Sequence, residues 1–158
     1  MKLNLFLSFL GLFIAFSSSA QQLKWNDPLK NKAIQGRIAT KELANYYRLP
    51  DQLKSQVRSP VWSLGTNSAG LYVDFKTDAS AITIRYKVSG SLNMPHMPTT
   101  GVSGVDLYAK DDKGNWNWAF GNYNFTDTVT YSYQKLGEML ILLIGYTYPC
   151  TILLNGWK

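Results

Sequence analysis

The stretch that decides the fold is LYVDFKTDASAITIRYKV, residues 71–88. Apolar and polar side chains alternate within it, on both sides of the turn residues at 77–80. In a β-strand successive side chains point to opposite faces, so a period of two indicates a strand with one buried face. The stretch therefore predicts two half-buried strands, 71–76 and 82–88, joined by a short turn.

The strand pattern is predicted to begin near Val61 and to continue along the chain beyond residue 88. It recurs in three further runs, at residues 105–110, 116–120 and 129–133. Turn residues separate these runs, and no long helix is indicated. Several short strands with this spacing favour an all-β fold, an antiparallel β-sandwich of jelly-roll or carbohydrate-binding-module type.

Residues 1–20 have the form of a cleavable signal peptide. A short positive start, Met1-Lys2, precedes a mostly apolar run at 3–16, and the small residues Ser18-Ser19-Ala20 follow. The apolar run is shorter than the roughly 20 residues that a membrane-spanning helix needs. We therefore expect export to the periplasm or the medium, no membrane partner, and a mature chain that begins at Gln21.

Composition limits the kind of protein further. The single Cys150 has no second cysteine for an internal disulfide, so packing must hold the one expected domain together. The formal charge is +6, but Lys and Arg are scattered and form no basic run, so we expect no nucleic-acid partner. An aromatic content of 14%, with 10 Tyr and 5 Trp, suits a β-rich fold.

The long segment from Ser89 to Gly104 is predicted to be a loop, and loops on a rigid scaffold often carry binding residues. It contains the only histidine, His96, between Met94 and Met97. His96 is either a base or substrate contact at the rim of a site, or a histidine hydrogen-bonded for structural reasons. We take Met94, His96 and Met97 as candidate binding residues.

The sequence gives less support to a metal site. Zinc needs three or four ligands, and one His and one Cys are too few. The acidic cluster at 111–115, DDKGN, lacks calcium-loop spacing and is better explained as a turn. The sequence therefore predicts no metal and no cofactor.

Aromatic residues on the predicted strands offer further contacts. Trp116 and Trp118 are two residues apart and so share a face. On an open face they would form a platform for sugar rings, and on the inner face they would be core, which is the favoured alternative. Tyr72 and Tyr108 fall on the polar phase of their strands, and we take them as exposed binding residues.

Several motifs resemble the N-terminal domain of SGNH/GDSL-type esterases. They are SPVWSL at 59–64, NSAGLY at 67–72, NMPHMP at 93–98 and GVSGVDLYAK at 101–110, and the last contains the family's Gly-x-Asp-Leu-Tyr signature from Gly104 to Tyr108. The resemblance implies a β-sandwich resembling a carbohydrate-binding module over residues 21–136. It also implies a serine esterase domain, normally on the same chain, that acts on acylated carbohydrate or similar esters.

The catalytic blocks of such esterases are not found in the sequence. There is no Gly-Asp-Ser; Asn26-Asp27 has Lys24 where glycine is required, and His96 has Asn93 where aspartate is required. We therefore predict no catalytic residues and an accessory role in positioning substrate or binding carbohydrate. The alternative is a free-standing carbohydrate-binding module, and an enzyme that uses His96 is disfavoured.

The tail at residues 137–158 departs from the resemblance, which leads us to expect a passage similar to YLPLYNTVKW. Instead the chain carries the apolar run MLILLI at 139–144 and ends LLNGWK. Codons for residues 146–157 can be chosen so that a neighbouring frame encodes the expected passage. We therefore favour a frameshift that truncated a longer esterase over a divergent terminal strand. On this hypothesis, residues beyond Leu136 should fit the sandwich poorly.

Overall fold

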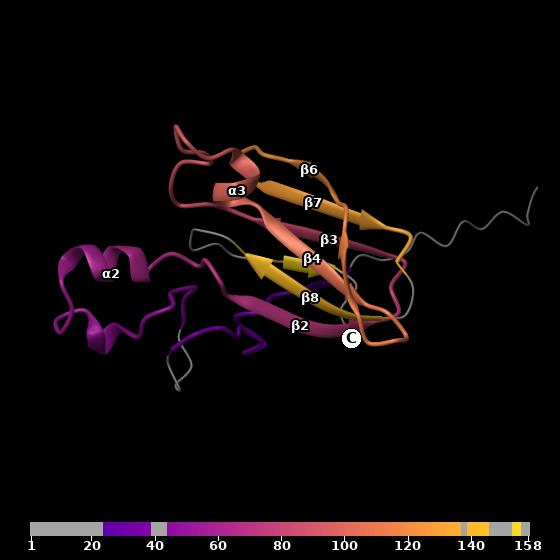
Figure 1. Ribbon diagram of the computed structural model, residues 1–158, viewed down its shortest axis with the longest axis horizontal. Helices are drawn as coiled ribbons and strands as arrows, with labels where there is room; N and C mark the ends of the chain where they lie inside the picture. The colour runs from indigo at the N-terminus through magenta and orange to yellow at the C-terminus, as the bar shows by residue number, and fades with distance from the viewer. Residues whose placement is uncertain (1–23, 39–43, 137–138, 146–152, 156–158) are drawn as a thin grey trace, which may run out of the picture.

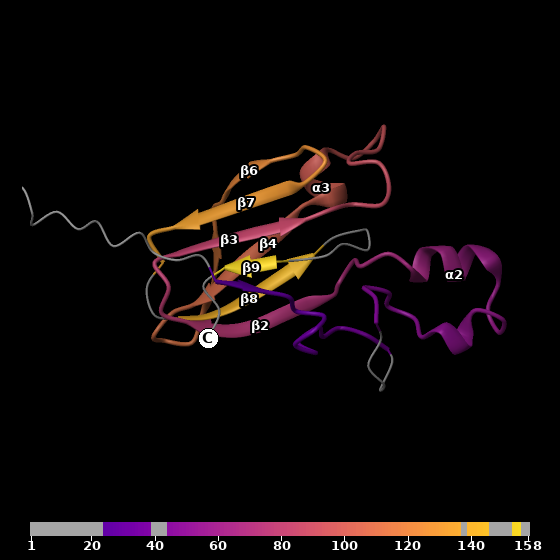
Figure 2. The ribbon, with the colours of Figure 1, turned by 180° about the vertical axis from the view of Figure 1, so that it is seen from behind.

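The computed structural model describes residues 24–38, 44–136, 139–145 and 153–155; the predicted signal peptide lies outside them. The described elements are mostly strands (Figures 1 and 2). In chain order they are β1 (Trp25–Asn26), a 3₁₀ turn (Asp51–Leu53), α2 (Ser59–Gly65), β2 (Tyr72–Thr77), β3 (Ala81–Tyr86), α3 (Thr99–Ser103), β4 (Val105–Lys110), β5 (Trp116–Ala119), β6 (Asn122–Asn124), β7 (Val129–Gln134), β8 (Met139–Gly145) and β9 (Leu153–Asn155).

The strands form two antiparallel sheets. One has the order β1-β9-β3-β7-β6 and the other the order β2-β8-β4-β5. Both sheets contribute to a single buried cluster, which includes Val73, Ile84, Leu107 and Tyr133. The predicted all-β, antiparallel class is therefore confirmed, while the jelly-roll arrangement stays a prediction.

The alternation in the sequence explains which face of each strand is buried. In β2, Val73, Phe75 and Thr77 are buried, while Asp74 and Lys76 between them are exposed. In β3, Ile82 and Ile84 are completely buried. These two strands lie in different sheets, because the turn between them carries the chain from one sheet to the other. The stretch at 71–88 thus supplies a strand to each sheet.

The strand pattern does not begin at Val61, as the sequence led us to expect. Residues 59–65 form α2, which has Pro60 in its first turn. Proline suits this position because its ring fixes a helical φ and the first-turn N–H groups have no partner within the helix. In the views of Figures 1 and 2, α2 projects beyond the end of the sheets where β2 begins, and α3 lies at the same end. None of the helices in the described segments is long and apolar enough to cross a membrane.

The expectation that residues beyond Leu136 fit the sheets poorly is wrong for β8. This strand lies between β2 and β4 and pairs with six residues of each. The physical reason is that a short, continuous apolar run is compatible with a central strand as well as with an unpaired segment. The absence of alternation was therefore no evidence against pairing. Residues 153–155 of the tail also pair, as β9, with β1 and β3.

Candidate functional site

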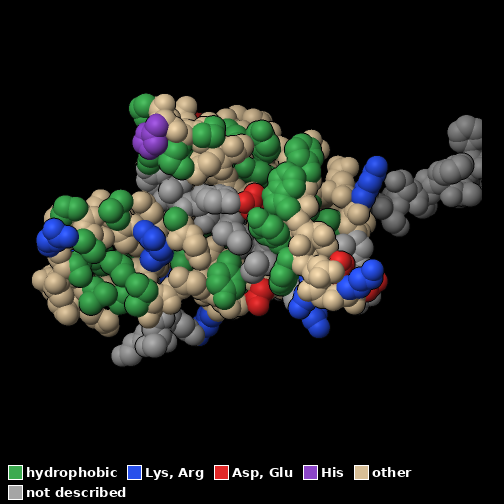
Figure 3. Space-filling model, in the orientation of Figure 1, with side chains coloured by type: hydrophobic (Ala, Val, Ile, Leu, Met, Phe, Trp, Pro, Cys, Tyr) green, Lys and Arg blue, Asp and Glu red, His purple; other side chains and the backbone are tan. Residues whose placement is uncertain are grey.

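The predicted binding loop contains more local structure than expected. Met94 and Met97 exchange backbone hydrogen bonds of 3.2 and 3.1 Å, which close a tight turn around Pro95 and His96. Pro98 then precedes the first residue of α3, so the segment 89–104 is not a loop throughout. His96 and Met97 are exposed and Met94 is half-buried. Figure 3 shows the histidine side chain in purple, at the surface. The turn explains the exposure of His96 and Met97.

Tyr72 and Tyr108 lie on the sheet that contains β8, and both are half-buried rather than open. Tyr72 is in register with Ile144, and Tyr108 with Leu142, on opposite sides of β8. Two strand spacings across the sheet and two residues along it therefore separate the tyrosine positions, a distance of about 12 Å. Neither of the two clefts described below is lined by these tyrosines or by the 94–97 turn, and their role in binding stays a prediction.

Trp116 and Trp118 share a face, as predicted, but that face is not the core. Their side chains are 42% and 55% exposed. They lie on β5, the last strand of its sheet, opposite Lys110 and Tyr108. The inner position of β5 is taken by Ala119, which packs against the core. The favoured interpretation of the tryptophans as core residues is therefore wrong.

The two tryptophans have different neighbours. The indole N–H of Trp118 donates a 3.0 Å hydrogen bond to Oδ1 of Asp106 on β4. The ammonium of Lys110 lies 5.6 Å from the centre of the Trp116 ring, within the range of a cation–π contact. Trp118 is thus held at its edge by a carboxylate, whereas Trp116 is approached on its face by a cation.

After Trp118 the chain turns from one sheet into the other. Phe120, 69% exposed, and buried Gly121 connect β5 to β6. A Cβ on Gly121 would lie 2.6 Å from the Tyr133 ring, so only glycine lets the backbone pass so close. Tyr123 on β6 then lies on the far side of the turn, 51% exposed.

These residues enclose a cleft of about 230 Å³. We call it the aromatic corner; it is lined by Thr100, Val105, Asp106, Trp118, Ala119, Phe120, Gly121, Tyr123, Tyr131 and Tyr133. In Figure 3, hydrophobic side chains gather in a band over the region of β4. Sequence reasoning missed most of this site because its parts come from four strands and a helix. The one sign of the aromatic corner in the sequence was the pair Trp116 and Trp118, followed by Phe120 and Gly121.

The inner wall of the aromatic corner consists of tyrosines stacked along β7. The Tyr131 and Tyr133 rings lie 6.2 Å apart, and Tyr123 lies 5.4 Å from Tyr131. Burial, as the main cause, raises the pKa of Tyr131 to about 12 and also raises the pKa of Tyr133. Both hydroxyls therefore stay neutral at physiological pH, where they act as hydrogen-bonding groups rather than as bases.

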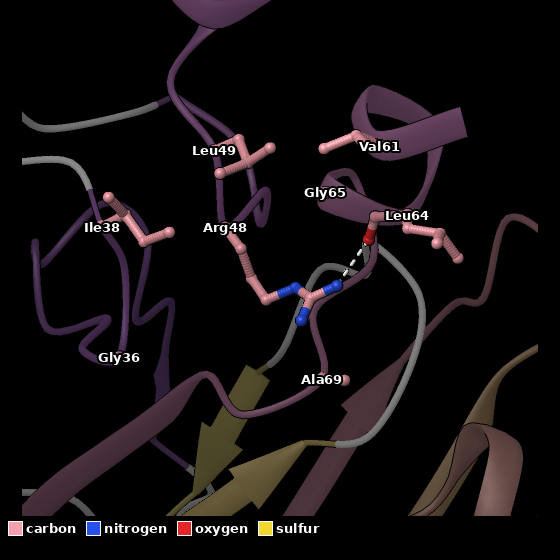
Figure 4. A pocket seen from close by; sticks show the side chains of 8 residues that line it. All are labelled: Gly36, Ile38, Arg48, Leu49, Val61, Leu64, Gly65 and Ala69. Carbon is pink, nitrogen blue, oxygen red and sulfur yellow. Dashed lines mark hydrogen bonds between the residues drawn. The ribbon is translucent and has the colours of Figure 1, made fainter. Parts of the chain in front are cut away.

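A second hollow, of about 450 Å³, lies beside α2 (Figure 4). Its lining is mainly apolar and includes Ile38, Leu49, Val61 and Leu64. The Arg48 guanidinium donates hydrogen bonds to the backbone oxygens of Leu64 and Asn67 at the end of α2. The Leu64 oxygen also accepts a hydrogen bond from the Asn67 N–H at 3.2 Å, so Arg48 adds a further donor at the C-terminal end of α2. Its role here is to hold α2 in place.

The Gly-x-Asp-Leu-Tyr signature has a structural explanation at each position. Gly104 follows the last residue of α3, and a Cβ there would collide with the carbonyl oxygen of Thr100 in that helix. Asp106 accepts the hydrogen bond from Trp118, and Leu107 is completely buried in the core. Tyr108 faces away from that core, opposite Trp118. The signature therefore links the core, α3 and the aromatic corner.

Comparison with known proteins gives the same family as the resemblance of the sequence motifs. The Gly-x-Asp-Leu-Tyr family, described as the N-terminus of SGNH hydrolase-type esterases, matches residues 23–140. The chain belongs to this family. Among curated proteins no sequence matches.

A solved structure described as a GDSL-like lipase from Bacteroides ovatus has a similar fold. The TM-score is 0.74 at 21% sequence identity, and the likeness covers 87% of this chain. It covers 41% of the other protein, so the present chain spans about two fifths of that protein's length. At this identity the likeness supports the fold. In the segments that the structure describes, no group of three acidic, His or Cys side chains is placed to hold a metal ion.

Proposed function

We propose that this chain is the non-catalytic accessory domain of an exported SGNH-type esterase and that it positions the substrate beside the catalytic domain. The observation that carries the proposal is the family match over residues 23–140, because that family is the N-terminus of such esterases. The missing catalytic sequence blocks support the non-catalytic assignment. The signal-like residues 1–20 support export.

We further propose acylated carbohydrate as the substrate class and a jelly-roll sandwich as the scaffold. Exposed aromatic side chains at a sheet edge, beside a carboxylate, support the first point. Rings offer a flat apolar face to the C–H groups of a sugar, while the carboxylate accepts hydrogen bonds from its hydroxyls. Because strand pairing fixes these groups, little ordering entropy would be lost on binding.

A second candidate function is a free-standing carbohydrate-binding module. The observation in its favour is that the aromatic corner is built within this chain alone, from α3, β4, β5, β6 and β7. Such a module would bind its ligand without an esterase. The two functions differ in whether a catalytic domain is encoded with this one.

Two measurements test the accessory-domain proposal. The purified chain should hydrolyse small aryl esters no faster than a heat-inactivated sample. Activity that disappears in His96→Ala but persists in Met97→Ala would establish an enzyme and contradict the proposal. The coding DNA is the second test: a frame that encodes Gly-Asp-Ser downstream of this domain supports the esterase. A downstream region without such a frame favours the free-standing module.

A further inference from the structure

We propose that the aromatic corner is a binding site for a single neutral pyranose ring, stacked on Trp118 with hydroxyls directed to Asp106. The inference rests on the proposed function, in that it names the site and the substrate class through which the domain would act. It is argued from the arrangement of Trp118, Phe120, Tyr123 and Asp106 around one cleft, which spacing along the sequence did not indicate.

The orientation of the Trp118 ring is set before any ligand arrives. Its N–H group is bound to Asp106 at 3.0 Å, and β5 is held by pairing with β4. Despite these contacts, more than half of the side chain remains exposed. A large ring that is fixed and yet open can receive a ligand face without the cost of being ordered on binding.

The shape of the site suits one ring. Trp118 and Phe120 have ring centres 6.1 Å apart with an angle of 69° between their planes, so they form two sides of a corner. Tyr123 also lines the cleft, and Gly121 lies against the Tyr133 ring. A volume of about 230 Å³ is below the roughly 300–1,000 Å³ of pockets that hold drug-sized molecules. The site therefore fits one sugar unit, with the neighbouring units outside it.

The chemistry of the lining favours a sugar over an apolar protein partner. An apolar partner that covered Trp118 and Phe120 would also cover Asp106, whose charge favours a ligand with hydroxyl donors over a hydrocarbon surface. A pyranose ring offers C–H groups to the aromatic faces and hydroxyl donors to the carboxylate oxygens. The hydroxyls of Thr100 and Tyr123 add further polar groups to the cleft lining.

Trp116 provides a matched control within the same strand. It has the same side-chain type, lies on the same face and is exposed to a similar extent. However, it is outside the cleft lining, and the Lys110 ammonium lies over its ring. A general affinity of exposed indoles for sugars would involve both tryptophans, whereas the proposed site involves Trp118.

The test is a titration of the purified chain with neutral oligosaccharides of xylose, glucose and mannose, each with and without O-acetyl groups. Binding is followed by isothermal calorimetry and by tryptophan fluorescence. We expect at least one sugar to bind, with affinity about tenfold lower in Trp118→Ala and nearly unchanged in Trp116→Ala. Asp106→Ala should also weaken binding. Circular dichroism checks that each variant is folded.

Three outcomes would overturn the site. They are no binding of any sugar by the folded chain, equal losses in the two tryptophan variants, or self-association that Trp118→Ala abolishes. The last outcome, read by light scattering, would make the corner an interface between copies of the chain. Because binding is measured on this chain, the site can fail while the accessory-domain assignment stands. Conversely, ester hydrolysis by the isolated chain would contradict the assignment and leave the binding result intact.

Discussion

The loop at residues 89–98, which precedes α3, and the aromatic corner show two ways in which a binding surface can arise. The loop concentrates distinctive residues in one short segment, and its shape comes from a local turn between Met94 and Met97. The aromatic corner combines common strand residues that are distant in sequence, and its shape comes from pairing between strands. The first kind of site is visible in a sequence, while the second depends on which strand is at the edge of its sheet.

The largest effect should come from truncation after Leu136, which tests how far the aromatic corner depends on the sheet. The truncation removes β8, which pairs with both β2 and β4. Since β4 would keep only β5 as a partner, we expect loss of cooperative thermal unfolding by circular dichroism. The 94–97 turn does not pair with β8. A truncated chain that melts near the wild-type temperature would show that the corner, like the loop, is held locally.

The second-largest loss of stability is expected for Leu107→Ala, in the core beneath the aromatic corner. Leu107 is fully buried, so its truncation should leave a cavity and lower the free energy of unfolding by roughly 2–5 kcal/mol. Tyr108→Ala is the matched control, because the neighbouring side chain faces away from the core. Urea denaturation measures both. Similar losses in the two variants would contradict the assignment of inner and outer faces on β4.

The buried tyrosines of the inner wall should make the free energy of unfolding depend on pH in the alkaline range. Burial raises the pKa of Tyr131 from near 10 to about 12, so the folded protein holds this proton more tightly than the unfolded chain does. The resulting stability is complete below about pH 10 and is lost as the pH rises through about 12. Thermal melts over this range should show a smaller decline for Tyr131→Phe than for wild type. An equal decline would mean that Tyr131 titrates normally.

The sequence predicted five strands close to their observed positions because apolar and polar residues alternate in each. In β2, β3, β4 and β7 the alternate residues are also buried, whereas three of the four residues of β5 are exposed. The prediction failed where alternation is lacking. The apolar run of β8 has no alternation, and the helix α2 contains too few residues to show a helical period. Alternation also placed Trp116 and Trp118 on one face but left open which face it was. That depended on Ala119 filling the inner position of β5, an outcome of packing across the sheets.

The Gly-x-Asp-Leu-Tyr signature identified the family from the sequence, but the roles of its residues required the structure. The clash at Gly104 involves α3, which the sequence had assigned to a loop. The role of Asp106 depends on Trp118, twelve residues away on the paired strand. Spacing along the chain does not show such contacts, because they follow from the register of β4 with β5.

The smallest effect on stability should come from His96→Ala, which tests the loop. His96 is exposed at a turn closed by backbone hydrogen bonds, so its loss should change the free energy of unfolding by no more than about 0.5 kcal/mol.

The effect of the same substitution on catalysis distinguishes the loop from the aromatic corner. In an esterase that carries this domain, a loop that contacts substrate or the catalytic domain would make His96→Ala lower kcat/KM on acylated polymer. If only the aromatic corner contacts substrate, Trp118→Ala would lower kcat/KM and His96→Ala would not. Steady-state kinetics of both variants on an acylated polymer and on a small aryl ester therefore decide between the regions. An unchanged kcat/KM for His96→Ala on both substrates would remove the loop residues Met94, His96 and Met97 from the candidate binding site.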